Sequence, residues 1–358
     1  METTAQFDPA KAEQFAGNLA DAFNKASLTM MISLGHRSGL FDSLAENHPS
    51  TSSQIAQAAN LHERYVREWL GAMVAGGVIE FETTNGTYRL PAEHAAFLTR
   101  KAGPENYAVF AEFIFSLAAN GDQVLDCMKN GGGISYDAYH RFYHAMDEDQ
   151  SIIGTFFQQL LPSIPDLTAK LHQGISVLDA GCGTGGLLLR LASEFTNSHF
   201  TGIDLTEFAI NMARSQAEKS GLANVEFICK DLTEFHSEAI ENRYDLVMSI
   251  DAIHDQKSPM NVLRGIYKTL KPDGTYLMVD INGSGHLHQD KDNPFAQLLY
   301  AISCMHCVPV SLGQGGEGLG AMWGETRIRD YTREAGFSSI TPYQFQSDPL
   351  NTYFIIGK

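Results

Sequence analysis

Residues 251–256, Asp-Ala-Ile-His-Asp-Gln, bring together side chains that can transfer protons. The pKa of a free imidazole lies near ~6.5, so we expect His254 to be largely neutral near pH 7 and able to act as a general base. Asp251 and Asp255 flank it and are candidates for orienting the imidazole or a bound substrate. A histidine that only holds this loop in place would have the same sequence pattern, so both roles stay open.

A second segment, residues 175–186, has the pattern of a ligand-binding turn. A short apolar run typical of a buried parallel strand ends at Asp179, and three glycines follow at alternate positions, Gly181, Gly183 and Gly185. A strand, a glycine turn and a helix present backbone N–H groups and a helix N-terminus to a ligand. Glycine permits both the tight turn and the close approach of that ligand.

The glycine pattern alone fits two classes of ligand. Gly181, Gly183 and Gly186 also match the dinucleotide-binding pattern, so a nicotinamide or flavin cofactor has to be considered. The next predicted strand ends at Asp204, and an acid at that position accepts hydrogen bonds from ribose hydroxyls in either class.

Two further features favour one class over the other. Asp179 stands directly before the turn, where a carboxylate can meet an amino-acid ammonium better than a pyrophosphate. A third predicted strand ends at Asp231 and Leu232, which suit the amino group and the ring face of an adenine. An ammonium, a ribose and an adenine together indicate S-adenosylmethionine (SAM).

Five segments in this region resemble the successive motifs of the class I SAM-dependent methyltransferases, in that family's order and spacing over residues 175–280. They are Asp-Ala-Gly-Cys-Gly-Thr-Gly, Gly-Ile-Asp-Leu, Lys-Asp-Leu, Tyr-Asp-Leu-Val-Met-Ser and Leu-Lys-Pro-Asp-Gly-Thr-Tyr-Leu-Met-Val-Asp. The resemblance implies an α/β fold, with a Rossmann-like seven-stranded sheet that ends in an antiparallel hairpin, and SAM as cofactor. The residues it assigns to the cofactor are Asp179, Gly181, Gly183, Gly185, Asp204, Leu205, Asp231, Leu232 and Ser249.

Two shorter likenesses concern the acceptor side. Residues 142–146, Phe-Tyr-His-Ala-Met, resemble an O-methyltransferase segment in which an aromatic side chain and a methionine lie near the SAM sulfur. Phe142 and Met146 are therefore candidate pocket residues, with plain core packing as the alternative. The His-Asp pair at His254 is similar to the His-Asp-Trp segment of plant-type O-methyltransferases, whose histidine deprotonates the acceptor hydroxyl. Gln256 stands where that family has tryptophan, so the acceptor pocket differs in detail.

The elements that position these residues alternate between strand and helix. We predict strands at 175–178, 199–203, 225–229, 245–250, 275–280, 338–345 and 351–356. Helices are predicted at 187–195, 259–270 and 328–336. Ligands bind at the carboxyl ends of parallel strands, so Asp204, Asp231 and residues 249–254 should converge on one crevice. Residues 281–325 interrupt the alternation with a helix over 294–307 and a glycine-rich run, and we interpret this insertion as a substrate lid. The methyltransferase domain is expected to span 173–358.

Residues 1–100 have the pattern of a winged helix. Helices are expected over 9–46, interrupted at 39–41, and over 54–59 and 63–75, followed by a hairpin that turns at Asn85-Gly86. These 100 residues hold 7 basic and 11 acidic side chains, so we expect dimerisation rather than DNA binding. Residues 101–172 are helical and apolar, and we interpret them as a linker or cap.

Charge and composition exclude several classes of partner. The net charge of −17 argues against nucleic acid, since neutralising phosphates requires clustered Lys and Arg. The N-terminus lacks a basic and apolar leader, and no apolar stretch approaches the ~20 residues of a membrane span, so a cytoplasmic protein without membrane contact is expected. Five scattered cysteines indicate free thiols. Cys304, His306 and Cys307 form one metal-like group without a second pair of cysteines, so we expect packing and no metal.

The leading hypothesis is a SAM-dependent methyltransferase that acts on the O, S or N atom of a small molecule and forms a homodimer through residues 1–100. In-line transfer of an activated methyl group requires alignment of the acceptor and removal of its proton, the step assigned to His254. A nicotinamide oxidoreductase and a ligand-sensing winged-helix regulator are the alternatives. The sequence does not identify the acceptor.

Overall fold

The computed structural model describes residues 7–358 and divides into two compact units, Met1–Phe115 and Ser116–Lys358. Residues 1–6, the beginning of the predicted dimerisation domain, lie outside the described part. Each unit is described by itself.

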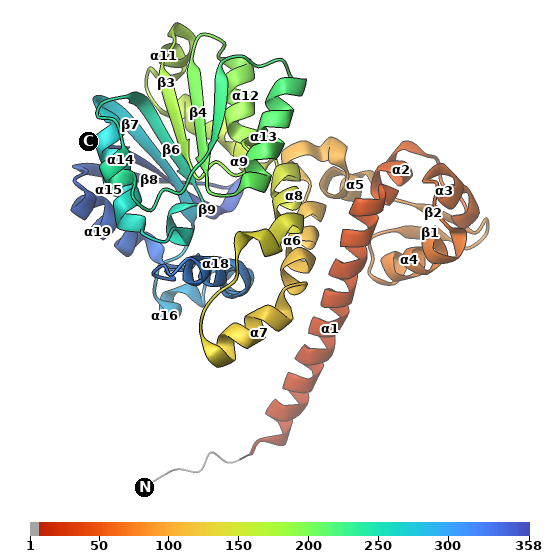
Figure 1. The fold of residues 1–358 in the computed structure, drawn as a ribbon. Coiled ribbons are helices and arrows are strands. Elements are labelled where there is room, and N and C mark those ends of the chain that lie inside the picture. Colours follow the sequence, from red (N-terminus) through yellow and green to blue (C-terminus); the bar gives the residue numbers. More distant parts are fainter. Residues whose placement is uncertain (1–6) are drawn as a thin grey trace. The chain divides into compact units, whose positions relative to one another are not determined.

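The first unit is a small helical domain with a two-stranded hairpin (Figure 1). Its elements in chain order are α1 (Pro9–Ser38), α2 (Leu40–Glu46), α3 (Ser52–Ala58), α4 (Glu63–Ala75), β1 (Glu80–Glu82), β2 (Thr87–Arg89), α5 (Ala92–Leu98) and the 3-10 turn η1 (Arg100–Glu105). Helix α6 (Ala108–Ala118) crosses the boundary to the second unit. The predicted order of helix, turn, helix and hairpin is confirmed.

Local signals explain where these helices begin and end. The Asp8 side chain accepts hydrogen bonds from the first backbone N–H groups of α1, and Gly39, with φ of 73°, ends that helix in the left-handed conformation. Thr51 and Gln54 form a reciprocal capping box at the start of α3. The buried side chains of Phe41 and Leu70 lie in the core that these short helices share.

The second unit holds a seven-stranded sheet, with strand order β5-β4-β3-β6-β7-β9-β8. Its strands are β3 (Ser176–Ala180), β4 (His199–Asp204), β5 (Val225–Cys229), β6 (Tyr244–Ile250), β7 (Leu270–Ile281), β8 (Ser339–Phe345) and β9 (Asp348–Gly357). The first five pair in parallel, and β9 runs antiparallel to both β7 and β8. The predicted Rossmann-like sheet with a closing hairpin is confirmed. The strand order reverses at β3, and that is where an open α/β sheet binds its ligand.

Helices cover both faces of this sheet (Figure 1). Besides the helices of the insertion described next, the helical elements of this unit after α6 are α7 (Gly121–Asn130), η2 (Tyr136–Tyr139), α8 (His140–Glu148), α9 (Ser151–Thr155), the π-turn η3 (Phe156–Leu160), α10 (Leu161–Ser163), α11 (Leu167–Gln173), α12 (Gly186–Glu194), α13 (Glu207–Lys219), α14 (Phe235–Glu238), η4 (Ile253–Asp255), α15 (Pro259–Thr269) and α19 (Gly324–Ala335). One core includes Leu188 from α12 and Ile210 from α13. The other includes Leu263 from α15 and Ile328 from α19.

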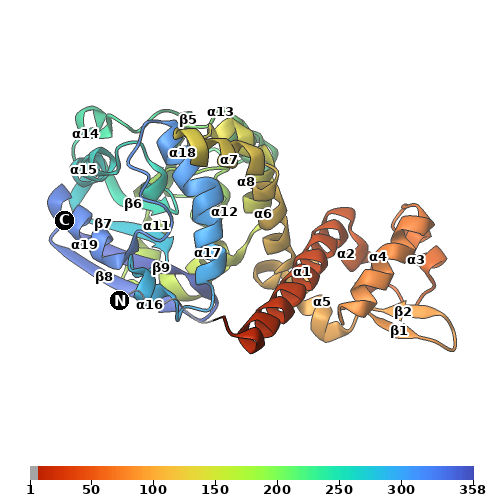
Figure 2. The ribbon, with the colours of Figure 1, turned by 90° about the horizontal axis from the view of Figure 1, so that it is seen from below.

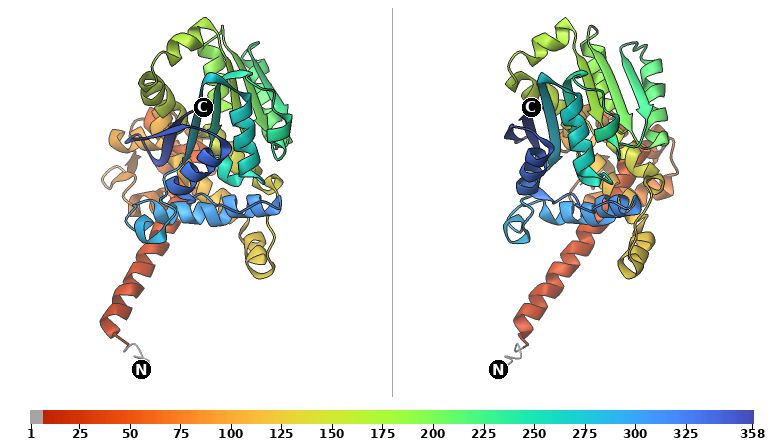
Figure 3. Two further views of the ribbon diagram at one scale, coloured as in Figure 1. Left: turned by 90° about the vertical axis from the view of Figure 1, so that its left-hand side faces the viewer. Right: turned by 60° about the vertical axis from the view of Figure 1, so that its left-hand side comes forward.

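The insertion predicted as a lid is folded rather than loop-like. It contains α16 (Leu287–Asp290), α17 (Ala296–Ile302), the π-turn η5 (Ser303–Cys307) and α18 (Val308–Gly313). Helices α17 and α18 follow one another as one rod (Figure 2), which crosses one end of the sheet (Figure 3, blue). The predicted helix over 294–307 therefore continues to Gly313.

A proline explains the π-turn within this rod. Pro309 lacks a backbone N–H, so it cannot donate to the carbonyl of Met305 as a regular helix requires. The Tyr139 hydroxyl donates to that carbonyl instead, at 2.7 Å. The helix widens at this point and continues through the proline.

The rod also corrects one expectation about membranes. Among residues 7–358, Ala296–Gly313 is one helix that is long and apolar enough to cross a membrane, although the sequence was expected to contain no such stretch. This is weak evidence for a membrane span, because core helices of globular proteins meet the same criterion. Leu299, Cys307 and Val310 are buried within the fold, as in a core helix.

Candidate functional site

The glycine turn after β3 has the geometry that only glycine accommodates. Gly181, Gly183 and Gly185 have φ of 90°, 52° and 77°. A Cβ on Gly181 would lie 2.5 Å from the Ala252 side chain, and one on Gly185 would lie 2.5 Å from the Phe227 ring. The turn thus packs tightly on its neighbours and leads directly into α12.

Asp204, at the end of β4, holds this turn in place. Its Oδ2 accepts a hydrogen bond from the Gly183 N–H at 2.9 Å, and its Oδ1 accepts one from the Thr206 N–H at 2.8 Å. Burial raises the pKa of Asp204, and these hydrogen bonds partly offset the rise. The residue predicted to bind a ribose therefore also shapes the loop beside it, which the sequence did not indicate.

Asp179, at the end of β3, is a buried carboxyl group. Its side chain is 3% exposed, and within residues 7–358 no hydrogen-bond partner reaches Oδ1. Burial, together with the nearby Asp204, raises its pKa to about 7. A buried acid with an open oxygen beside a glycine turn is suited to receive a ligand's ammonium group.

Three further residues predicted to bind the cofactor follow two strands: Leu205 comes after β4, and Asp231 and Leu232, the predicted adenine residues, come after β5. Leu232 is buried, whereas Leu205 and Asp231 are exposed. Oδ1 of Asp231 accepts a hydrogen bond from the Thr233 N–H at 2.8 Å. An apolar surface beside an exposed acid is compatible with an adenine ring and its amino group.

Ser249, which is predicted to contact the cofactor, is the last residue but one of β6. Its side chain is fully buried within the sheet, and its hydroxyl lies 2.7 Å from the hydroxyl of Tyr276 on β7. Side chains alternate between the two faces along a strand, and this one points into the core, so the cofactor contact of Ser249 stays a prediction that its backbone would have to make.

The two residues of α8 predicted to lie near the SAM sulfur differ in their surroundings. Phe142 is buried and stacks on the His306 ring, with centroids 4.5 Å apart, whereas Met146 is 41% exposed. On the same helix, the Tyr143 hydroxyl lies 2.9 Å from Oγ1 of Thr206, directly after Asp204. Helix α8 thus contacts the loop that carries Asp204, as a cap over the ligand would.

His254 lies in η4, directly beyond β6, and is 2% exposed. Its Nδ1 lies 2.8 Å from Oδ1 of Asp280, and the Trp323 indole N–H donates to the same oxygen at 3.0 Å. Burial lowers the pKa of His254, but Asp280 and Asp255 outweigh that effect and raise it well above its usual value. The expectation of a largely neutral imidazole near pH 7 is therefore not borne out, since both carboxylates favour the protonated ring.

The two predicted acids beside it also differ. Asp251 has φ of 48°, and burial and the nearby Asp280 raise its pKa well above the usual range. Oδ2 of Asp255 accepts a hydrogen bond from the Tyr136 hydroxyl at 3.3 Å, and its Oδ1 lies 3.5 Å from Nε2 of His254. Asp255 is thus the acid that faces the free nitrogen of His254.

The cysteine-histidine group of η5 packs on this cluster. Cys307 and His306 are buried, while Cys304 is exposed. Nδ1 of His306 lies 3.6 Å from Oδ2 of Asp255. Burial, followed by the charge of Asp255, raises the pKa of the Cys307 thiol to about 12, and burial lowers the pKa of His306.

Sequence reasoning did not assign a chemical role to Asp280, Tyr136 or Cys307. Asp280 could have been found from its place, because it stands at the carboxyl end of a predicted parallel strand, as do Asp179 and Asp204. No local pattern relates Cys307 to His254.

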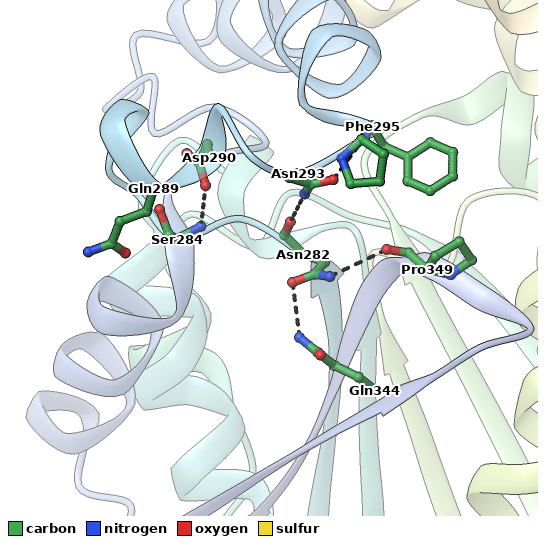
Figure 4. A pocket seen from close by; sticks show the side chains of 9 residues that line it. Asn282, Ser284, Gln289, Asp290, Asn293, Phe295, Gln344 and Pro349 are labelled. Atoms are coloured by element: carbon green, nitrogen blue, oxygen red, sulfur yellow. Dashed lines mark hydrogen bonds between the residues drawn. The ribbon is translucent and has the colours of Figure 1, made fainter.

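A separate polar cavity of about 430 Å³ lies where the chain leaves β7, beside the β8–β9 turn (Figure 4). Asn293 donates to the carbonyl of Asn282, and the Asn282 amide in turn donates to the carbonyl of Pro349 and accepts from Gln344 (Figure 4). None of the predicted site residues lines it. Its amides largely satisfy one another, so we assign it no chemistry.

Comparison with known families agrees with this two-part organisation. Residues 26–100 match the family model of the Rv2258c-like winged HTH domain, and residues 171–326 match that of a methyltransferase domain. Among curated proteins, N-methyltransferase 4 of Papaver somniferum is 34% identical over 111 residues, which is 31% of this chain and 31% of that protein. The chain thus spans about a third of the length of such relatives.

Solved structures are similar over nearly the whole chain. The complex of human N-acetylserotonin methyltransferase with SAM covers 100% of this chain and 99% of its own, with a TM-score of 0.69 and 17% identity. An O-methyltransferase family protein from Burkholderia thailandensis covers 99% of both chains, with a TM-score of 0.68 and 16% identity. At these identities the likeness establishes the fold.

Proposed function

Taking as premise that this chain joins an Rv2258c-like winged HTH domain to a class I SAM-dependent methyltransferase domain, we propose that it transfers the methyl group of SAM to an O, S or N atom of a small-molecule acceptor. The observation that supports this most is the open carboxylate oxygen of Asp179, buried beside the glycine turn after β3.

Three groups of this chain are suited to bind SAM. Asp179 offers an unpaired acid to the ammonium of the amino-acid part. Asp204 keeps lone pairs for the ribose hydroxyls while it holds the Gly183 N–H. Leu232 and Asp231 border the place where the adenine would lie. The hydroxyl of Ser249 is paired inside the sheet, so a contact of this residue with SAM would come from its backbone.

Bound SAM supplies a methyl group that its positive sulfur has already activated. The protein then has to align the acceptor with that methyl group and exclude water. The acceptor side is expected at η4 and η5, where His254, Asp255, His306 and the Tyr136 hydroxyl form one buried cluster. Phe142 and His306 form a stacked wall suited to a flat or apolar acceptor.

For His254 we propose positioning of the acceptor side rather than the general-base role expected from the sequence. Asp280 and Trp323 fix the imidazole on one side, and Asp255 lies against its other nitrogen. A histidine enclosed in this way is held in a single orientation. Its role would be to keep Asp255 and the other residues of the acceptor side in place.

The first unit is proposed to form a homodimer. Helix α1 exposes apolar side chains along much of its length within its own unit, among them Phe15, Phe23 and Met30. DNA binding is not proposed, since Arg67 and Arg64 on α4 each pair with a glutamate of the same helix. We further propose that the protein works in the cytoplasm, in line with its scattered free cysteines.

Calorimetry tests the cofactor assignment directly. The full chain should bind SAM with a one-to-one stoichiometry and should bind neither NAD⁺ nor a DNA duplex library. A screen of metabolite extracts with methyl-labelled SAM should then transfer label to a small molecule. Binding of NAD⁺ without SAM binding would overturn the proposal.

A further inference from the structure

Three donor atoms of different chemistry converge next to η4. His254, Asp255 and Cys307 each offer one atom, a ring nitrogen, a carboxylate oxygen and a thiol sulfur, and these atoms lie within 4.8 Å of one another. All three residues are buried. Cys307 comes from η5, far along the chain from the other two, so the fold alone brings the set together.

The imidazole is oriented as in a metal site. Nδ1 of His254 lies 2.8 Å from Asp280, which leaves Nε2 directed at the other two donors. A metal-binding histidine typically donates its second ring N–H to a carboxylate, which fixes the ring and makes the ligating nitrogen more basic. Asp280 and His254 reproduce that second contact.

Asp255 supplies an independent observation. Its side chain is 7% exposed, and within residues 7–358 Oδ1 has no hydrogen-bond partner, whereas Oδ2 accepts from the Tyr136 hydroxyl. Oδ1 lies 3.5 Å from Nε2 of His254. Two ligands of a tetrahedral zinc ion are separated by roughly 3.4 Å, so the two atoms already have the spacing of a metal-bound pair.

We propose that Nε2 of His254, Oδ1 of Asp255 and Sγ of Cys307 bind one divalent transition-metal ion of the zinc class. A mixed nitrogen, oxygen and sulfur set selects Zn²⁺ or Co²⁺ over Mg²⁺ and Ca²⁺, which take oxygen ligands. A carboxylate and a thiolate neutralise the two charges of the ion. Coordination also releases two protons, the thiol proton of Cys307 and the Nε2 proton of His254, because a metal ion binds a thiolate and a neutral imidazole.

Three protein ligands leave a fourth position open, which is the pattern of catalytic rather than structural zinc. Resting on the proposed function, this open position would bind the nucleophilic atom of the acceptor, a thiolate or an alkoxide. The metal would then lower the pKa of that atom, a task that the enclosed imidazole is not placed to perform.

Cobalt provides a readout that does not depend on activity. The full chain, stripped with a chelator and titrated with Co²⁺, should bind one ion and develop thiolate-to-cobalt charge-transfer absorption together with the visible bands of four-coordinate Co²⁺. Cys307→Ser should lose the charge-transfer absorption, and Asp255→Asn should weaken Co²⁺ binding by at least the roughly 10–100-fold typical of outer contacts. Asp280→Asn should weaken it about 10–100-fold while the absorption remains.

Cys304→Ser is the matched control, since Cys304 belongs to the same π-turn but is exposed and outside the cluster. It should leave Co²⁺ binding unchanged. Failure of the wild-type chain to bind stoichiometric Co²⁺, or charge-transfer absorption that survives Cys307→Ser, would overturn the metal site. Urea unfolding of each variant, which does not depend on SAM, shows whether it is folded. If the wild-type chain does not bind SAM at all, that result contradicts the methyltransferase proposal, whereas the metal result remains valid.

Discussion

Asp280 and His254 form a buried pair that joins the end of β7 to the turn after β6, with Oδ1 and Nδ1 2.8 Å apart and both side chains almost fully enclosed. The indole of Trp323 donates to the same carboxylate oxygen. Three segments of the chain therefore meet at one carboxylate, and the orientation of the imidazole depends on all of them.

This pair predicts a non-additive effect on stability. His254→Gln leaves Asp280 charged and buried, so the free energy of unfolding should fall by about 3–5 kcal/mol. Asp280→Asn should have a similar but smaller effect, because an amide still accepts hydrogen bonds from Trp323. The double variant should be less destabilised than the sum of the two single variants. Urea unfolding measures this coupling, and strict additivity would show that the two residues do not act as a pair.

The raised pKa of Asp179 predicts that SAM affinity depends on pH. The carboxyl group has a pKa of about 7 in the free protein, and only its ionised form attracts an ammonium. Affinity should therefore increase about tenfold per pH unit below pH 7 and level off above it. Above about pH 8 it should decline again as the α-amino group of SAM loses its proton.

Asp179→Asn provides the control for that profile. It should bind SAM more weakly and lose the rise with pH, because an amide does not titrate. Calorimetry from pH 5.5 to 8.5 gives both curves. A wild-type affinity that is flat across this range would assign the ammonium to another residue.

Asp204 is predicted to matter to SAM binding in two ways. Asp204→Ala removes a charged acceptor, and such hydrogen bonds contribute about 1.5–3 kcal/mol, so SAM affinity should fall by about one to two decades. It also frees the Gly183 N–H, so the glycine turn should become less protected against hydrogen exchange. Asp231→Ala should leave the hydrogen exchange of the glycine turn unchanged, because Asp231 is exposed and accepts its hydrogen bond from the Thr233 N–H. Unchanged affinity in Asp204→Ala would remove it from the ribose site.

Two glycines allow packing to be separated from backbone strain. Gly185 and Gly221 both have positive φ, of 77° and 65°, but an added Cβ meets the Phe227 ring at 2.5 Å only at Gly185. Gly221→Ala should cost about 1–2 kcal/mol for the left-handed conformation alone. Gly185→Ala should cost about 1–3 kcal/mol more from overpacking and should weaken SAM binding. Equal destabilisation of the two variants would show that Phe227 yields freely.

The homodimer predicted for the first unit can be disrupted at α1. Phe15 and Phe23 are 62% and 67% exposed, and charges at both positions should convert a dimer to a monomer. Light scattering on Phe15→Asp/Phe23→Asp measures the mass in solution. Asn24→Asp, on the same helix, should leave the dimer intact. A wild-type chain that is monomeric at micromolar concentration would contradict the prediction.

Much of the fold could be predicted because its signals are local. The order of apolar strands, glycine turn and helices led to the parallel sheet, and Asn85-Gly86 led to the hairpin. Asp179 and Asp204 could be proposed as ligand residues for the same reason, since each stands at the carboxyl end of a parallel strand. Such residues can be predicted from their position at the end of a strand alone.

The cluster around His254 could not be found in this way. Its chemistry depends on Asp280, Trp323 and Cys307, which reach it only through tertiary packing. Asp280, one of the two carboxylates that raise the pKa of His254, also reaches it through that packing. A sequence pattern gives the type of a titrating group, whereas its pKa is set by neighbours that the pattern does not contain.

The number of residues in the π-turn η5 determines which side chain of the rod faces His254. Five residues, Ser303–Cys307, form a turn that is wider than a regular helical turn. Deleting or inserting one residue there would rotate everything beyond it by about 100° about the helix axis relative to the preceding part. Cys307 would then leave the side of the rod that faces His254, although no side chain in the cluster had been replaced. In related sequences, the length of the segment that corresponds to η5 would therefore decide whether the site keeps a thiol beside His254.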